Sequence, residues 1–81
     1  MNVAVRYFAS LVDLTGVACE RVEVGPDDGV EQLWALLVSR HPGLGDLGFR
    51  PMVACDMEYA SWHRKLDGVH EVAFLPPVSG G

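Results

Sequence analysis

The first part of the chain contains two short segments in which apolar and polar residues alternate. In residues 3–8, Val3, Val5 and Tyr7 share one face of an extended backbone, and valines alternate with charged residues over residues 20–24. β-Branched and aromatic side chains favour strands. We therefore predict two strands that pair as a hairpin.

A longer segment has the periodicity of a helix with one apolar face. Its apolar residues recur at intervals of three and four positions: Val30, Leu33, Trp34, Leu37 and Val38. Asp28 with Glu31 three residues later fits a capping box at the helix start, and Pro42 disfavours helical backbone before it. This segment is predicted to form the main helix, and a shorter helical segment over residues 9–15 is predicted to end at Gly16.

The second half of the chain holds two further strand candidates. Residues 52–57 and 71–75 are separated by a polar stretch with an Asp67-Gly68 turn signal. The order is thus strand, strand, helix, strand, strand. One helix laid across a small mixed sheet buries the apolar faces of all these elements. We predict an α+β domain over residues 1–75, followed by a flexible tail over residues 76–81.

Length and charge limit the functions that such a chain can perform. An 81-residue chain buries only about 60–65% of its unfolded surface, which leaves little room for a deep catalytic pocket. Eleven acidic residues against six basic ones give a net charge of −5, which disfavours nucleic acid as a partner. Residues 3–12 lack the features of a signal peptide or a membrane span. We expect a cytoplasmic protein that binds neither nucleic acid nor membranes.

Side chains suited to catalysis or metal binding are scattered. The histidines and carboxylates show no ligand spacing, so we predict surface positions for them and no metal site. Cys19 and Cys55 are predicted to be reduced thiols. Residues 43–48 match G-x-G-x-x-G but follow a helix instead of a strand, so we interpret them as a loop in which Leu44 and Leu47 cover the helix end.

The last six residues differ from the rest of the chain. Pro76-Pro77 lacks backbone donors and fixes φ, so the last strand cannot continue and the chain leaves it as a stiff arm. The two terminal glycines can enter a channel that a side chain would block. The reactive group at the tip is the α-carboxylate of Gly81, an anion that a partner must activate, usually as an acyl-adenylate. A frayed terminus or a cloning remnant is the alternative interpretation.

Three blocks of the sequence resemble one protein family. From Val72 onward the chain reads Val-Ala-Phe-Leu-Pro-Pro-Val-Ser-Gly-Gly, which is similar to the C-terminal signature of the small subunit of molybdopterin synthase. Residues 5–11 followed by Gly16 resemble the opening strand and helical turn of this family, and residues 53–54 with residues 58–60 resemble its middle strand. The blocks follow the order of the family and the chain has a typical length for it, so the resemblance extends over nearly the whole chain.

The resemblance implies a ubiquitin-like β-grasp fold, which agrees with the predicted order of elements. It also implies a non-catalytic, sulfur-donating subunit of a sulfurtransferase complex in molybdenum cofactor biosynthesis. An E1-like enzyme would adenylate the terminal carboxylate with ATP, and a sulfur donor protein would convert it to a thiocarboxylate. The large synthase subunit would receive the tail and sulfurate a cyclic pyranopterin precursor. The complex would be a heterotetramer, and the chain itself would bind no cofactor.

Carried over to this sequence, the resemblance makes Gly81 the residue that accepts sulfur and Gly80 the residue that gives it clearance. The inserting arm would consist of Pro76, Pro77, Val78 and Ser79. Phe8 and Leu75 would present an apolar docking surface to the partner, with core packing as the alternative for both side chains.

Two positions depart from the family pattern, and other functions stay open. Asp56 stands where relatives usually carry Asn, and residues 69–71 read Val-His-Glu where relatives usually carry Gly-Asp-Glu. Both departures concern turn geometry and leave the tail chemistry unchanged. The alternatives are a sulfur carrier for thiamine or another pathway, a ubiquitin-like modifier that forms isopeptide bonds through Gly81, and an interaction module whose tail only docks.

Overall fold

The computed structural model describes residues 1–77, and its elements follow the predicted order with additions. The strands are β1 (Asn2–Tyr7), β2 (Cys19–Glu23), β3 (Met52–Cys55), β4 (Glu58–Ala60) and β5 (Glu71–Leu75). The helices are α1 (Ser10–Thr15) and α2 (Val30–Arg40), followed by the short 3-10 helix η1 (Pro42–Asp46). The predicted strands over residues 3–8 and 20–24 lie within one residue of β1 and β2, and residues 71–75 form β5 as predicted.

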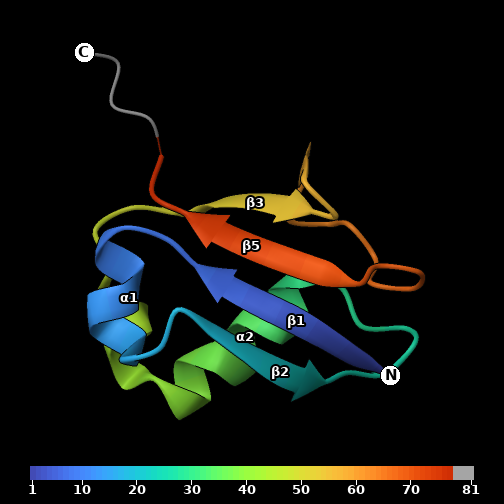
Figure 1. Ribbon diagram of the computed structural model, residues 1–81, viewed down its shortest axis with the longest axis horizontal. Helices are drawn as coiled ribbons and strands as arrows, with labels where there is room; N and C mark the ends of the chain where they lie inside the picture. The colour runs from blue at the N-terminus through green and yellow to red at the C-terminus, as the bar shows by residue number, and fades with distance from the viewer. Residues whose placement is uncertain (78–81) are drawn as a thin grey trace.

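The five strands form one mixed sheet in the order β2-β1-β5-β3-β4. β1 and β5 are parallel, and the other neighbours in the sheet are antiparallel. Figure 1 shows the arrowheads of β1 and β5 pointing to the side on which α1 lies, with α2 crossing one face of the sheet. The predicted small mixed sheet with one main helix packed on it is confirmed. Within residues 1–77, no helix combines the length and the apolar character that crossing a bilayer requires.

The core lies between α2 and the sheet. Val30, Leu33 and Leu37 on α2 are inaccessible to solvent, as predicted from their spacing. Full burial of one such side chain contributes roughly 1.5–3 kcal/mol, which is why one apolar helix face suffices to hold this helix on the sheet. Trp34 lies at the edge of the stripe, with its ring centroid 4.8 Å from that of Phe74 on β5. The main helix therefore packs directly on the strand that leads to the tail.

The start of α2 differs from the predicted capping box. Gly29 is the N-cap in an extended conformation, and its N–H donates to Gln32 Oε1 at 2.8 Å. Asp28 turns back instead and accepts from Gly25 N at 2.8 Å, closing the preceding turn. The prediction from Asp28 and Glu31 was wrong by one residue. A Cβ at position 29 would lie 3.1 Å from the Arg64 carbonyl oxygen, so any other residue there would push the two crossing chain segments slightly apart.

The segment predicted as one strand over residues 52–57 is also different. β3 ends at Cys55, Asp56 and Met57 form a turn with positive φ, and the chain returns as β4, which the sequence pattern did not predict. β4 is a short edge strand, so it needs little apolar alternation of its own. The glycine-rich segment is partly the 3-10 helix η1, in which Leu44 is buried beneath the end of α2 as expected.

Candidate functional site

The root of the C-terminal tail, by which we mean the end of β5 at Leu75, lies in the centre of the sheet. β5 lies between β1 and β3, with Leu75 opposite Met52, and Phe8 N donates to Phe74 O at 3.2 Å. Pro76 is half-buried and Pro77 is exposed, so the chain leaves the sheet beyond the end of β5, on the side of α1 (Figure 1). A tail attached to a central strand has a fixed starting point relative to both faces of the sheet.

The predictions for the tip of the tail fall on residues that the structure does not describe. Val78, Ser79, Gly80 and Gly81 lie outside the described residues, so their roles stay predictions. For Pro76 and Pro77, the described backbone agrees with the end of the strand at Leu75, where the donors needed for further pairing are missing. Their insertion into a partner also stays a prediction.

The face of the sheet opposite α2 is hollowed by small residues. Ala73 on β5 lies between Arg6 on β1 and Ala54 on β3, and Ala54 in turn lies opposite Tyr59 on β4. Two adjacent alanines between longer side chains leave a shallow groove of about 270 Å³. Its apolar lining comprises Phe8, Ala54, Met57, Tyr59, Ala73 and Leu75. We call this surface the open face.

Exposure decides between docking and core packing for the predicted apolar residues. Phe8 is 39% exposed and Leu75 is half-buried, and both line the open face. Burial in the core is therefore excluded for Phe8, whereas docking on a partner stays a prediction for both. Tyr59 and Met57 are 70% and 90% exposed, and the sequence analysis missed them. The two-residue period of β5 was a recognisable signal for Ala73 and Leu75, which it places on the face opposite the buried Val72 and Phe74. No such signal pointed to Met57 and Tyr59, because the turn and β4 were not predicted.

The open face also carries one ion pair. Arg6 Nη1 lies 3.9 Å from Glu71 Oε2, and the Arg6 guanidinium carbon lies 5.6 Å from the centroid of the Phe8 ring. An exposed pair of this length contributes little to stability. The pair instead matters for binding, because it places one positive and one negative group beside an apolar groove. These charges favour a partner with complementary charges.

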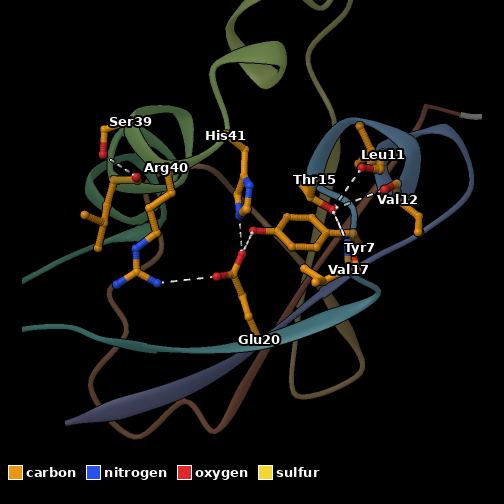
Figure 2. A network of polar contacts seen from close by, with 10 residues as sticks. Tyr7, Leu11, Val12, Thr15, Val17, Glu20, Ser39, Arg40 and His41 are labelled. Atoms are coloured by element: carbon orange, nitrogen blue, oxygen red, sulfur yellow. Dashed lines mark hydrogen bonds and ion pairs between the residues drawn. The ribbon is translucent and has the colours of Figure 1, made fainter.

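A polar cluster joins the β1–β2 hairpin to the C-terminal end of α2 (Figure 2). Glu20 Oε2 lies 2.6 Å from Tyr7 Oη and 2.7 Å from His41 Nε2, and Glu20 Oε1 lies 3.4 Å from Arg40 Nη1. Because an ionised carboxylate only accepts, Tyr7 and His41 both donate to it. The surface position predicted for His41 was wrong, since its side chain is enclosed in this cluster, whereas His63 and His70 are exposed.

This cluster changes the ionisation of its members. Burial alone would raise the pKa of Glu20, but hydrogen bonds from Tyr7, His41 and Arg40 outweigh it, and the pKa is lowered. Burial and the neighbouring Glu20 carboxylate raise the pKa of Tyr7 well above its ordinary value. Glu20 is thus an anion and Tyr7 a neutral donor at neutral pH. The arrangement stabilises the fold, and it lies on the α2 side of the sheet, away from the open face.

Replacement of Glu20 is expected to remove a pH-dependent part of the stability. The pKa of Glu20 is lower in the folded protein than the ordinary glutamate value of 4.5, so its ionised form stabilises the fold above pH 4.5. This stabilisation is lost as the pH falls through the folded pKa. Glu20→Gln should therefore lower the free energy of unfolding by about 1–2 kcal/mol at pH 7 and by little under strongly acidic conditions. Urea unfolding followed by tryptophan fluorescence between pH 2 and 8 measures this difference.

The matched control removes a carboxylate from the same strand. Glu23 is 72% exposed at its side chain and pairs with the terminal amine at 2.7 Å, so Glu23→Gln should cost less than about 0.5 kcal/mol. A Glu20→Gln variant whose unfolding free energy parallels that of the parent at every pH would contradict the role assigned to the cluster.

The cysteines agree with the prediction of reduced thiols. Neither Cys19 nor Cys55 takes part in a disulfide; Cys19 is exposed on the edge strand β2, and Cys55 is buried. Burial raises the pKa of the Cys55 thiol, which makes it a poor nucleophile. Within residues 1–77, no three histidine, cysteine or acidic side chains gather closely enough to hold a metal ion.

The strand order, the one main helix packed on a face of the sheet and the exit of the chain from a central strand define a ubiquitin-like β-grasp protein. The chain belongs to the ThiS family, whose model matches residues 5–81. It is 37% identical to the human molybdopterin synthase sulfur carrier subunit, over 99% of this chain and 94% of that protein.

Solved structures of other proteins share this fold, and two of them are informative here. The crystal structure of the small archaeal modifier protein SAMP1 from Haloferax volcanii has a TM-score of 0.82 at 30% identity and covers 100% of both chains. A complex of subunits 1 and 2 of the molybdopterin-converting factor from Helicobacter pylori contains a chain with a TM-score of 0.66 at 23% identity, again over 100% of both chains. At that identity the second likeness establishes the fold alone.

Proposed function

We propose that this chain is the sulfur-carrier subunit of a molybdopterin synthase and that the Gly81 carboxylate carries the sulfur. Similarity to the human sulfur carrier subunit along almost the entire length of the chain supports the role. The observation that carries the proposal is the open face, an apolar groove that runs along β5 to the root of the tail at Leu75. A partner that receives the tail can therefore rest on this groove.

The proposed chemistry replaces one carboxylate oxygen by sulfur. A carboxylate oxygen of Gly81 attacks the α-phosphorus of ATP on an E1-like enzyme, pyrophosphate leaves, and the mixed anhydride makes the carbonyl carbon electrophilic. A donor protein supplies sulfur at the sulfide level, which displaces AMP and leaves a thiocarboxylate. That sulfur attacks a carbon of the cyclic pyranopterin precursor and displaces an oxygen substituent from it, which forms an acyl–sulfur–carbon link. Water then cleaves the acyl–sulfur bond, which restores the Gly81 carboxylate and leaves the sulfur on the precursor.

This chain contributes the carrier and its reach, and its partners contribute the catalysis. The tail, residues 76–81, spans at most roughly 20 Å when extended, enough to reach an active site inside another subunit. The product of the sulfur transfer is the dithiolene of molybdopterin, which contains two sulfur atoms. Each carrier delivers one sulfur atom, which fits a heterotetramer of two small and two large subunits. We place this cycle in the cytoplasm, where ATP and reduced thiols are present.

Mass spectrometry of the chain purified from its native cells tests the proposal. We expect a fraction of the intact protein to carry one sulfur in place of one oxygen, and fragmentation to locate the change at Gly81. Incubation with the large subunit and the pterin precursor should return that fraction to the carboxylate form. Carboxylate alone, both in cells and after incubation with the activating enzyme, ATP and a sulfur donor, would refute the proposal.

The likeness to an archaeal modifier protein favours a second candidate function. A ubiquitin-like modifier would use the same adenylate but transfer Gly81 to a lysine amine. Recovery of lysine-linked conjugates in place of thiocarboxylate would support this function. Sulfur transfer to a thiamine precursor, or to another acceptor, would instead keep the carrier role and change only the recipient.

A further inference from the structure

The turn between β3 and β4 holds a large apolar residue in an unfavourable backbone conformation. Asp56 and Met57 have φ of 50° and 71°, and both lie in the left-handed region. Asp tolerates this region, whereas an unbranched apolar residue such as Met gains nothing locally from it. A two-residue hairpin turn of this kind usually carries glycine at its second position. Met57 is therefore retained at a position where glycine would be more stable.

The surrounding structure fixes this turn through Asp56. Asp56 Oδ1 accepts from His70 N at 3.0 Å and from Glu71 N at 2.9 Å, and Asp56 N donates to Glu71 O at 2.9 Å. These contacts tie the turn to the start of β5. The hydrogen bonds from Glu71 and His70 also hold the pKa of the Asp56 carboxyl below its ordinary value, so it accepts as an anion. The backbone that presents Met57 is thus rigid.

Packing within the molecule does not explain the choice of methionine. The Met57 side chain is 90% exposed and lines the end of the open face farthest from the tail. The turn is bonded to the first residue of β5, and the tail begins after its last, Leu75, so the two ends of the groove are separated by about 13 Å. A strained backbone position that adds an apolar side chain to the surface shared with Phe8, Tyr59 and Leu75 points to a contact with another molecule.

We propose that Met57 is a second docking anchor, which inserts into an apolar pocket of the large synthase subunit and, together with Phe8 and Leu75 at the tail root, sets the direction in which the tail enters. This inference rests on the proposed function. The large subunit is the partner that we expect to contact Met57. A subunit that receives the tail beyond Leu75 also covers the groove, and the groove ends at Met57. Two contacts at opposite ends of the groove prevent the rotation that a single contact would allow.

The chemistry of methionine suits this role. Its flexible, polarisable side chain adapts to apolar pockets of irregular shape. The Arg6–Glu71 pair lines the same groove and gives the interface a polar edge. Truncation of an apolar anchor that fills a pocket of the partner commonly weakens an interface by tenfold or more.

The test compares four variants of the full chain by calorimetric titration with the purified large subunit of the same organism. Met57→Gly is expected to raise the dissociation constant by about tenfold while raising the melting temperature by about 4 °C. Met57→Asn should weaken binding similarly, because Asn tolerates the backbone but is polar. Met57→Leu should bind within about threefold of the parent. Phe49→Ser, which removes a 37% exposed ring from a groove beside α2, should leave the dissociation constant unchanged.

Opposite changes in stability and affinity distinguish an anchor from a structural residue, since loss of fold would lower both. Met57→Gly with the affinity of the parent would overturn the inference and leave the proposed function standing. Self-association of the parent that is lost in Met57→Gly, with unchanged affinity for the large subunit, would assign the face to a second copy and also overturn it. Failure of the parent itself to bind the large subunit would refute the proposed function.

Discussion

Deletion of Gly81 is expected to abolish sulfur transfer without unfolding the domain. The proposed carrier group is the terminal carboxylate, and removal of one residue withdraws it from the partner's active site by one residue length, about 3.5 Å. A displacement of about 1 Å can already reduce a rate a hundredfold. Extension by one glycine should be equally damaging, because the carboxylate then overshoots. Single-turnover conversion of the pterin precursor, with parent and variant subjected to the same thiocarboxylation reaction, measures the loss.

Folding and docking provide the internal controls for the Gly81 variants. Residues 1–77, which hold the described core and the open face, are unchanged in both, so the melting temperature and the affinity for the large subunit should stay close to those of the parent. Sulfur transfer by the Gly81 deletion at the parent rate would show that the carrier group lies elsewhere. Loss of transfer together with loss of the fold would refute the separation of tail and domain.

Truncation of Phe74 is expected to have the largest effect on stability. Phe74 is inaccessible to solvent on the central strand β5, and its ring centroid lies 4.8 Å from that of Trp34 and 5.8 Å from that of Trp62. Phe74→Ala removes this contact and leaves a cavity, at a cost of about 3–5 kcal/mol. A domain of this size has a total stability of roughly 4–12 kcal/mol, so this one substitution removes a large part of it. Urea unfolding followed by tryptophan fluorescence measures the loss.

The next residue on the same strand is the matched comparison. Leu75 faces the other side of the sheet and is half-buried, so Leu75→Ala should lower the free energy of unfolding by only about 1 kcal/mol while weakening binding to the large subunit. Equal losses of stability in the Phe74 and Leu75 variants would contradict the assignment of their side chains to opposite faces.

The elements predicted best from the sequence are those specified by their own residues. The three- and four-residue spacing that begins at Val30 predicts α2, and the apolar run over Glu71–Leu75 ended by Pro76 predicts β5 with its bounds. In both cases local periodicity and backbone chemistry agree with the tertiary environment, so no distant contact is needed to locate the element. The resemblance of the C-terminal block to a known family led to the correct family for the same reason, since it depended on a continuous motif.

The features that sequence reasoning missed depend on partners distant in the chain. Glu20 appeared to be one of many surface carboxylates, and only the fold brings Tyr7 and His41 to it. β4 is a short edge strand whose pairing with β3 is set by the turn at Asp56. The helix α2 begins one residue later than predicted, at a point where Val30 N donates to the Arg64 carbonyl oxygen at 3.0 Å. Each outcome was decided by a contact across many residues.

The sequence alone therefore determined the order of the main elements, the buried face of the main helix and the family to which the chain belongs, because these depend on periodicity and on a contiguous motif. Only the tertiary structure decided that Ala54 and Ala73 lie side by side to form a groove, that Tyr59 and Met57 line it, and that the groove ends where the tail begins. The physical reason is that the groove joins residues of β1, β3, β4 and β5, and the pattern within one strand does not specify which strands become its neighbours.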